Sequence, residues 1–335
     1  MEAKKDLILK VDHLNTQISV GRKTVYAVND VSLEIERGKT LGIVGESGCG
    51  KSITAFSVMQ LIPKNAKITG GSVTFFPKDE EPKIISAYKQ YGKEMRAIRG
   101  KDIAMVFQDP MTSLNPVYTI GAQIMENLKN HENIPKDEAK ARIIRLLGEL
   151  GIPAPEQRYR EYPHQFSGGM KQRVMIAIAM ICNPSLLIAD EPTTALDVTI
   201  QAQILSLMKQ VQRTHGTSIA LITHNMGIVA NFCDKVVVMY MGRDVETGSV
   251  EQIFNDPRHP YTKALLASVP VLGMDRTRKL STIEGSTPDP TQTYGYCEFA
   301  PRCAYASERC WKGHPESAAV EPGHTVRCFL CEEGQ

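Results

Sequence analysis

A single glycine-rich segment restricts the fold of this 335-residue chain more than any other feature. Residues 45–52 read GESGCGKS and match the pattern G-x-x-x-x-G-K-[ST]. They follow a short apolar run, Leu41–Val44, and precede a stretch of helical character, Ile53–Leu61. Glycines let the backbone curl so that amide N–H groups point at phosphate oxygens, and a helix start adds partial positive charge. The segment predicts a phosphate-binding loop in an α/β fold.

Each residue of this loop is a candidate for binding a nucleotide. We expect Lys51 to reach the β- and γ-phosphates and the Ser52 hydroxyl to ligate Mg²⁺. The alternative is a glycine-rich structural turn that matches by chance, and the flanking strand and helix argue against it. The candidate ATP-binding residues are Gly45, Glu46, Ser47, Gly48, Cys49, Gly50, Lys51 and Ser52.

Short apolar runs rich in Val and Ile alternate with longer segments of helical period, a pattern typical of a mainly parallel sheet covered by helices. Thr199–Gln212 places apolar side chains on one face, as a crossover helix does. Residues 7–12 and 26–36 alternate like antiparallel strands and predict a side sheet. The expected core strands are Leu41–Val44, Ile103–Phe107, Leu186–Asp190, Ser218–Thr223 and Val236–Tyr240.

No convincing strand pattern occurs between residues 119 and 182. Ile120–Asn130 and Lys136–Leu150 have helical character there. They predict a helical insertion in the α/β domain at about residues 110–182.

The composition changes towards the C-terminus. From about Glu246, Pro, Cys, Thr and Gly accumulate and strand patterns cease, so we expect a domain boundary near residues 245–255. The predicted division is an α/β domain at 1–245 and an extension at 246–335.

Charge and hydropathy limit the functional classes. Lys plus Arg number 39 and Asp plus Glu number 37, so the net charge of +2 is too balanced for polyanion binding to be the main task. The N-terminus is charged, and nowhere do roughly 18 consecutive apolar residues occur. We expect a soluble, cytoplasmic chain.

Two adjacent carboxylates end the run at 186–190. A carboxylate at a strand tip beside a phosphate loop can hold Mg²⁺, usually through water, and a second one can polarise the attacking water. We assign Asp190 to the metal and Glu191 to general-base catalysis. Taken alone, such a pair is commonly a solvated strand end, but the neighbouring motifs favour the functional interpretation.

Four further motifs accompany these acids: Gln108 after a core strand, FSGGMKQR at 166–173, PTTALD at 192–197, and His224 at a strand end. Together with the phosphate loop they closely resemble the nucleotide-binding subunits of ATP-binding cassette (ABC) transporters, over about residues 7–250. Kinases and GTPases that share the phosphate loop lack the Ser-Gly-Gly signature, so they are excluded. The resemblance implies an ABC-type nucleotide-binding domain with ATPase activity.

The resemblance also implies residue roles. Gln108 would sense Mg²⁺ and the attacking water, Asp197 would link the two sites of a dimer, and His224 would sense the γ-phosphate. A signature loop would contact the γ-phosphate of ATP bound to the opposite subunit, and its residues are Ser167, Gly168 and Gly169.

The sequence departs from the commonest family pattern. Phe166 and Met170 stand where Leu and Gln are usual, although the retained run at 171–173 argues for a working site. The aromatic residue that stacks on adenine is left unassigned, because the loop before Ala27 offers only Tyr26 as an aromatic.

Three less universal stretches, 108–116, 165–170 and 259–266, resemble the branch of dipeptide, oligopeptide and nickel importers. This resemblance implies a second ATPase subunit, identical or paralogous, two transmembrane permease subunits and, indirectly, an extracytoplasmic solute-binding protein. It places the chain at the cytoplasmic face of the membrane. From the residues alone, 259–266 predicts only a helix opened by Pro260 that packs Tyr261 on the core.

Eight cysteines are present, and five crowd into the last 39 residues. In a reducing compartment such crowding indicates a metal site more than disulfides, and thiolates suit Zn²⁺ or an iron–sulfur cluster. The family branch carries cysteines at the first four of these positions, where a [4Fe–4S] cluster is implied, and we favour that cluster over Zn²⁺. The expected ligands are Cys297, Cys303, Cys310 and Cys328, with Cys331 as the spare thiol.

Two other functions are weighed against this one. A soluble ABC-type ATPase acting on nucleic acid or ribosomes would share the nucleotide motifs. The chain lacks a basic stretch interleaved with aromatic residues, so no nucleic-acid partner is expected. An exporter subunit is disfavoured because the importer-like tail is present and no membrane segment is fused.

Overall fold

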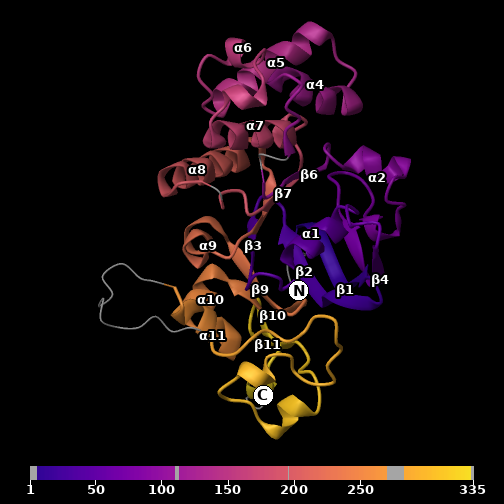
Figure 1. Cartoon of the computed structure of the whole chain (residues 1–335), viewed down its shortest axis with the longest axis vertical. Helices are drawn as coiled ribbons and strands as arrows, with labels where there is room; N and C mark the ends of the chain where they lie inside the picture. Colours follow the sequence, from indigo (N-terminus) through magenta and orange to yellow (C-terminus); the bar gives the residue numbers. More distant parts are fainter. Residues whose placement is uncertain (1–5, 110–112, 195, 270–282, 333–335) are drawn as a thin grey trace.

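The computed structural model describes residues 6–109, 113–194, 196–269 and 283–332. Helices α4 to α7 lie at one end of the molecule, two sheets lie in the middle, and the C-terminal extension lies at the other end (Figure 1). Within those ranges no helix combines the length and apolar character that a membrane crossing requires. The helices are α1 (Lys51–Val58), α2 (Lys93–Ile98), α4 (Ile120–His131), α5 (Lys136–Glu149), α6 (Pro155–Arg158), α7 (Gly168–Met180), α8 (Val198–His215), α9 (Met226–Phe232), α10 (Val250–Asn255), α11 (Pro260–Ala267) and α12 (Phe329–Glu332).

The larger sheet has eight strands in the order β11-β12-β10-β9-β3-β8-β7-β6. The strands from β9 to β6 pair in parallel, whereas β10, β12 and β11 extend the sheet by antiparallel pairing. The five predicted core strands and the α/β class are confirmed, because strands buried on both faces are encoded as continuous apolar runs. The strands are β3 (Thr40–Val44), β6 (Ile103–Val106), β7 (Leu186–Asp190), β8 (Ser218–Ile222), β9 (Lys235–Tyr240), β10 (Arg243–Ser249), β11 (Ala318–Glu321) and β12 (His324–Val326).

A second, antiparallel sheet has the order β2-β1-β4-β5. Side chains of this sheet, of the larger sheet and of α1 share one buried apolar cluster that includes Leu33, Ile43 and Ala55. This packing holds the start of α1 against both sheets. The predicted side sheet is confirmed, and its strands are β1 (Leu7–Val20), β2 (Lys23–Glu36), β4 (Ala66–Phe75) and β5 (Lys83–Ile84).

The helical segment between β6 and β7 also matches its prediction. Helices α4 and α5 occupy the expected ranges, and residues 119–182, all of them described, contain no strand. Their apolar faces pack with α7 and α8 in a second buried cluster, which includes Ile124, Leu147 and Ile176. Phe166, the unusual residue of the signature motif, is 5% exposed and belongs to this cluster.

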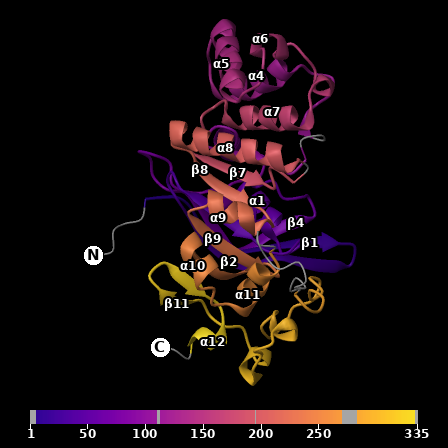
Figure 2. The ribbon, with the colours of Figure 1, turned by 90° about the vertical axis from the view of Figure 1, so that its left-hand side faces the viewer.

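The expectation that strands cease at Glu246 is wrong. Strand β10 runs through Glu246, and the chain returns much later to pair Glu246 with Val326 of β12. Strands β11 and β12 contain four and three residues, too few for a pattern of period two to stand out. The predicted boundary near residue 245 therefore falls inside a strand, and the extension adds to the main sheet (Figure 2).

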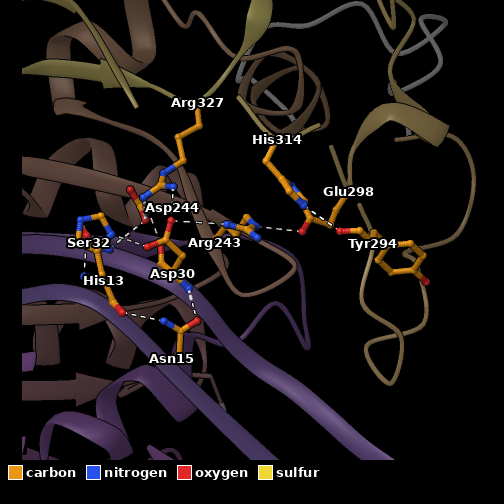
Figure 3. Close-up of polar contacts among 10 residues, drawn as sticks. All are labelled: His13, Asn15, Asp30, Ser32, Arg243, Asp244, Tyr294, Glu298, His314 and Arg327. Carbon is orange, nitrogen blue, oxygen red and sulfur yellow. Dashed lines mark hydrogen bonds and ion pairs between the residues drawn. The ribbon is translucent and has the colours of Figure 1, made fainter. Parts of the chain in front are cut away.

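Charged groups tie the extension to both sheets (Figure 3). Arg327 lies 2.7 Å from the Asp30 carboxylate on β2 and 3.4 Å from the Asp244 carboxylate on β10. Arg243 on β10 donates from Nε to Glu298 Oε1 at 2.9 Å. Because these partners are far apart in sequence, the extension is docked by tertiary contacts and not by its linker.

Candidate active site

The phosphate loop takes its shape from its glycines. Strand β3 is buried along its length, and the loop that follows ends at Gly50, the N-cap of α1. Gly50 has a φ of +103°, and a Cβ at this position would lie 2.2 Å from the Ala27 carbonyl oxygen. Only glycine fits there. The backbone amides of the loop can therefore converge at the start of the helix, as phosphate binding requires.

Lys51 lies folded into this loop. It is 6% exposed, and its Nζ donates to the carbonyl oxygens of Gly45 at 2.8 Å and Glu46 at 2.9 Å. The ammonium group is thereby fixed at the floor of a pocket that Ser52, Gln108 and Glu191 also line. A buried, oriented cation is suited to bind phosphate oxygens.

Ser52 and Asp190 form the candidate magnesium site. The Ser52 hydroxyl donates to Asp190 Oδ1 at 3.1 Å, and Asp190 is 2% exposed. Burial raises the pKa of Asp190, an effect that the hydrogen bond from Ser52 partly offsets. Mg²⁺ in proteins usually takes one or two carboxylates together with substrate phosphates, so this pair of oxygen donors fits the ion.

Glu191 follows β7 directly and is held by three side chains. Gln108 Nε2 donates to Oε2 at 3.0 Å, the Thr194 hydroxyl donates to Oε2 at 2.9 Å, and His224 Nδ1 lies 2.9 Å from Oε1. Burial alone would raise the pKa of Glu191, but the hydrogen bonds from His224 and Thr194 and the charge of Lys51 hold it below its ordinary value. The carboxylate is therefore charged at neutral pH and ready to accept a proton.

The backbone at Glu191 also departs from the ordinary. Its φ is +45°, a left-handed conformation that non-glycine residues seldom adopt. The sequence prediction missed Thr194 as a partner of Glu191. A signal was present, since Thr194 lies in the 192–197 motif only three residues from the carboxylate.

The structure does not bring the signature residues into this pocket. Ser167 is exposed and caps α7 by accepting from Met170 N at 3.4 Å. Asp197 is exposed and caps α8 by accepting from Ile200 N at 3.0 Å. Neither lines the pocket of Lys51, and the same holds for Gly168 and Gly169. In one chain, the predicted ATP site is therefore assembled only in part.

The pocket of Lys51 is also lined by Ile18, Val25 and Tyr26, which belong to the segment where the adenine-stacking residue was left unassigned. Pro290 of the C-terminal extension completes this wall, and its carbonyl oxygen accepts from Tyr26 N at 2.9 Å. No local pattern could have pointed to Pro290, because only the fold places it beside the loop.

The cysteines of the extension are not grouped as a metal site among the described residues. Cys297 and Cys310 approach through a backbone hydrogen bond of 2.9 Å, and burial raises the pKa of the Cys297 thiol to about 11 and that of Cys328 to about 12. Among the described residues, which include all five clustered cysteines, no group of three or more Cys, His, Asp or Glu side chains could hold a metal ion. The donor set therefore does not support a [4Fe–4S] cluster or Zn²⁺, and no step below passes through a metal there.

Comparison with known proteins decides the family. Residues 28–194 match the family described as ABC transporter, and residues 245–310 match the C-terminal region of oligopeptide/dipeptide transporters. The oligopeptide transport ATP-binding protein AppD of Bacillus subtilis is 48% identical over 327 residues, 97% of each chain. The chain belongs to the ATP-binding subunits of peptide ABC transporters. The dipeptide transport ATP-binding protein DppD of the same organism is 47% identical, covering 97% of this chain and 95% of DppD.

Solved structures agree with this family of ABC ATPases. The ATP-binding cassette MJ0796, described as a dimer in a post-hydrolysis state bound to ADP and Pi, has a TM-score of 0.62 and 26% identity. The match covers 72% of this chain and 98% of MJ0796. The cassette cbiO1 of Clostridium perfringens, part of a transporter complex, has a TM-score of 0.62 and 30% identity, with 75% and 92% covered. The predicted ABC ATPase is confirmed, and the nucleic-acid alternative is not supported.

Proposed function

We propose that this ABC ATPase subunit hydrolyses MgATP in the Lys51 pocket and thereby energises the import of oligopeptides or dipeptides through a membrane permease. One observation carries the chemistry: the Glu191 carboxylate is held by Gln108, Thr194 and His224 in the pocket that Lys51 lines. The substrate class follows from the relatives and from the C-terminal region, both described as serving oligopeptides or dipeptides. Nickel, the other substrate considered from the sequence, receives no such support.

The chain's own groups divide the work of hydrolysis. Lys51 and the loop amides bind the β- and γ-phosphates and stabilise the charge that develops in phosphoryl transfer. Ser52 and Asp190 would hold Mg²⁺, which supplies further charge neutralisation when bound. Glu191 orients a water molecule in line with the γ-phosphate and accepts its proton as the water oxygen bonds to phosphorus. The bond from phosphorus to the β–γ bridging oxygen breaks at the same time, so that ADP and phosphate leave. Gln108 and His224 hold the carboxylate in place for that attack.

The signature residues that are absent from the Lys51 pocket of one chain point to a second ATPase subunit as the partner. In the proposed complex, Ser167 and the first two residues of α7, Gly168 and Gly169, of a second ATPase subunit close over the ATP bound at Lys51. That second subunit is identical or paralogous. The exposed N-terminus of α7 would direct its amides and partial positive charge at the γ-phosphate. Closure requires ATP to bind the closed dimer more tightly than the open one. Asp197, exposed at the start of α8, would lie at the junction.

This arrangement predicts association that depends on ATP. The Glu191→Gln variant, which should bind ATP without hydrolysing it, is expected to sediment as a monomer alone and as a dimer with MgATP. Adding Lys51→Ala to that variant should abolish the dimer, because the shared ligand is lost. A failure to associate with itself and with a paralogous partner, at saturating ATP, would contradict the shared site.

Peptide uptake tests the function as a whole. Cells from which this chain is removed should lose ATP-dependent uptake of a labelled dipeptide or oligopeptide, and the wild-type chain should restore it. The Lys51→Ala chain, present at the same level, should not. Uptake of every tested peptide at the normal rate in cells without the chain would contradict peptide import.

The remaining assignments complete the proposal. We place the subunit at the cytoplasmic face of the membrane, bound to two permease subunits and served indirectly by an extracytoplasmic solute-binding protein. Residues 1–245 would supply the ATPase and 246–335 the importer-type extension. The [4Fe–4S] cluster on the tail cysteines, with Zn²⁺ as the alternative, stays a prediction from the sequence that iron and sulfide analysis of the purified chain decides.

A further inference from the structure

One arginine of the extension reaches the phosphate loop itself. Arg302 lies 256 residues after Glu46, the second residue of the loop, yet the two side chains form a two-pronged ion pair. Nη1 lies 2.7 Å from Glu46 Oε2, and Nη2 lies 3.0 Å from Oε1. The Arg302 side chain is 3% exposed, and the Glu46 side chain is 28% exposed. Parallel, paired hydrogen bonds of this kind fix orientation as well as distance.

Further hydrogen bonds fix the position of the Arg302 guanidinium. Its Nε donates to the Glu284 carbonyl oxygen at 3.0 Å, and Nη1 also donates to the Tyr240 hydroxyl at 3.3 Å. A guanidinium group stays protonated in proteins, so Arg302 carries a positive charge. The extension thus presents a fixed positive charge to the loop.

The backbone of Glu46 connects the ion pair with Arg302 to Lys51, the expected phosphate-binding residue. Its N–H donates to the hydroxyl of Tyr261 on α11 at 2.9 Å, and its carbonyl oxygen accepts from Lys51 Nζ at 2.9 Å. Tyr261 is fully buried and packs against Tyr240, with ring centroids 4.7 Å apart. One residue of the loop is therefore held by the extension through its side chain and its N–H, while its carbonyl oxygen orients the phosphate-binding lysine.

The negative charge of Glu46 means that its ion pair with Arg302 can affect the affinity of the loop for an anionic ligand. A carboxylate in a loop that binds phosphate opposes the approach of the anionic ligand, since like charges a few ångströms apart repel. Arg302 neutralises that carboxylate from the side away from solvent. Without Arg302, the carboxylate would be left unpaired in the loop, directly before Ser47 and Gly48, which line the Lys51 pocket.

We propose that Arg302 is a positioning residue for ATP binding, which acts through Glu46 to hold the phosphate loop in its binding shape and to cancel a repulsive charge. This inference rests on the proposed function, because it requires ATP at Lys51. It makes the C-terminal extension a determinant of nucleotide affinity within the same chain. Preorganising a loop in its bound conformation strengthens binding by lowering the cost of ordering it.

The test compares two arginines that both dock the extension. Arg302→Gln breaks the contact with Glu46. Arg243→Gln instead breaks ion pairs with Glu298 and Asp30, neither of which belongs to the phosphate loop (Figure 3). The measured quantity is the Kd of the full chain for a non-hydrolysable ATP analogue with Mg²⁺, by titration calorimetry. We expect Arg302→Gln to raise this Kd about five- to tenfold, as for a typical coupling between sites, and Arg243→Gln to leave it unchanged.

A second substitution separates the charge effect from lost folding. Adding Glu46→Gln to Arg302→Gln should return the Kd to that of Glu46→Gln alone, because the unpaired carboxylate is then gone. A merely structural role would lower the melting temperature without such rescue. Arg302→Lys keeps the positive charge but loses the paired donors of the guanidinium, so its Kd should lie between those of the wild type and Arg302→Gln. This variant replaces Arg302→Gln in the test if Arg302→Gln does not fold.

Three results would overturn the inference. They are an unchanged Kd in both Arg302 variants, an equal rise in Arg302→Gln and Arg243→Gln, and a double variant no better than Arg302→Gln. If the wild-type chain itself fails to bind the analogue, the proposed function falls as well. Tight wild-type binding that Lys51→Ala weakens and Arg302→Gln leaves intact would contradict the inference alone and leave the proposed function standing.

Discussion

Glu191→Gln is expected to slow ATP hydrolysis by about two to four orders of magnitude, the usual contribution of a general base. Glutamine fills the same space and can keep contacts with Gln108, Thr194 and His224, but it cannot accept a proton from water. Phosphate binding by Lys51 is untouched, so ATP affinity should be retained. Steady-state phosphate release measures the first effect, and equilibrium binding of ATP measures the second.

A matched carboxylate serves as the control for this loss. Glu36 is partly buried and paired with Lys235, and it lies outside the pocket of Lys51. Glu36→Gln should therefore hydrolyse ATP at the wild-type rate. Peptide uptake should fail with Glu191→Gln and persist with Glu36→Gln. Wild-type turnover in Glu191→Gln would show that another group activates the water.

Lys51→Ala is expected to act one step earlier, on binding. The change removes a buried cation whose charge-assisted hydrogen bonding to phosphate would contribute about 1.5–3 kcal/mol in total, so ATP affinity should fall by about 10- to 150-fold. Folding should survive, because the carbonyl oxygens of Gly45 and Glu46 then face a pocket open to water. Titration of ATP against the full chain measures the change.

A surface lysine shows whether the effect is specific. Lys312 is 69% exposed and pairs with Glu308 in the extension, away from the phosphate loop. Lys312→Ala should bind ATP as the wild type does, because an exposed ion pair contributes little. An unchanged affinity in Lys51→Ala would remove Lys51 from the phosphate site and with it the assignment of the loop.

Much of the nucleotide-binding half was predictable because its signals are local. Strand β7 was predicted at Leu186–Asp190, its observed bounds, since an unbroken apolar run encodes a strand buried on both faces. The loop at 45–52 was predictable because its glycines, lysine and serine act within one turn of chain. The carboxylates Asp190 and Glu191 could be paired with that loop because the acids and the loop lie at the ends of two parallel strands of the same sheet, β7 and β3, whose carboxyl ends lie at one edge with β8 between them.

Other features of the site and of the extension could not be predicted from the sequence. Thr194 was within a recognised motif, but nothing in the motif showed that its hydroxyl donates to Glu191. The short strands β11 and β12 carry too few residues for a periodic pattern, so their return to the main sheet was missed. The cysteine spacing suggested a metal site, and the arrangement of the thiols does not support it.

The α/β class, the phosphate loop, the acids after β7 and the family follow from the amino-acid sequence, because each depends on residues close together in the chain. The folded structure was needed to show that Pro290 lines the nucleotide pocket and that Arg302 forms an ion pair with Glu46. These contacts join segments more than 250 residues apart. Their existence depends on how the extension packs around Tyr261 and Tyr240, and packing is a property of surfaces that meet only after the chain has folded.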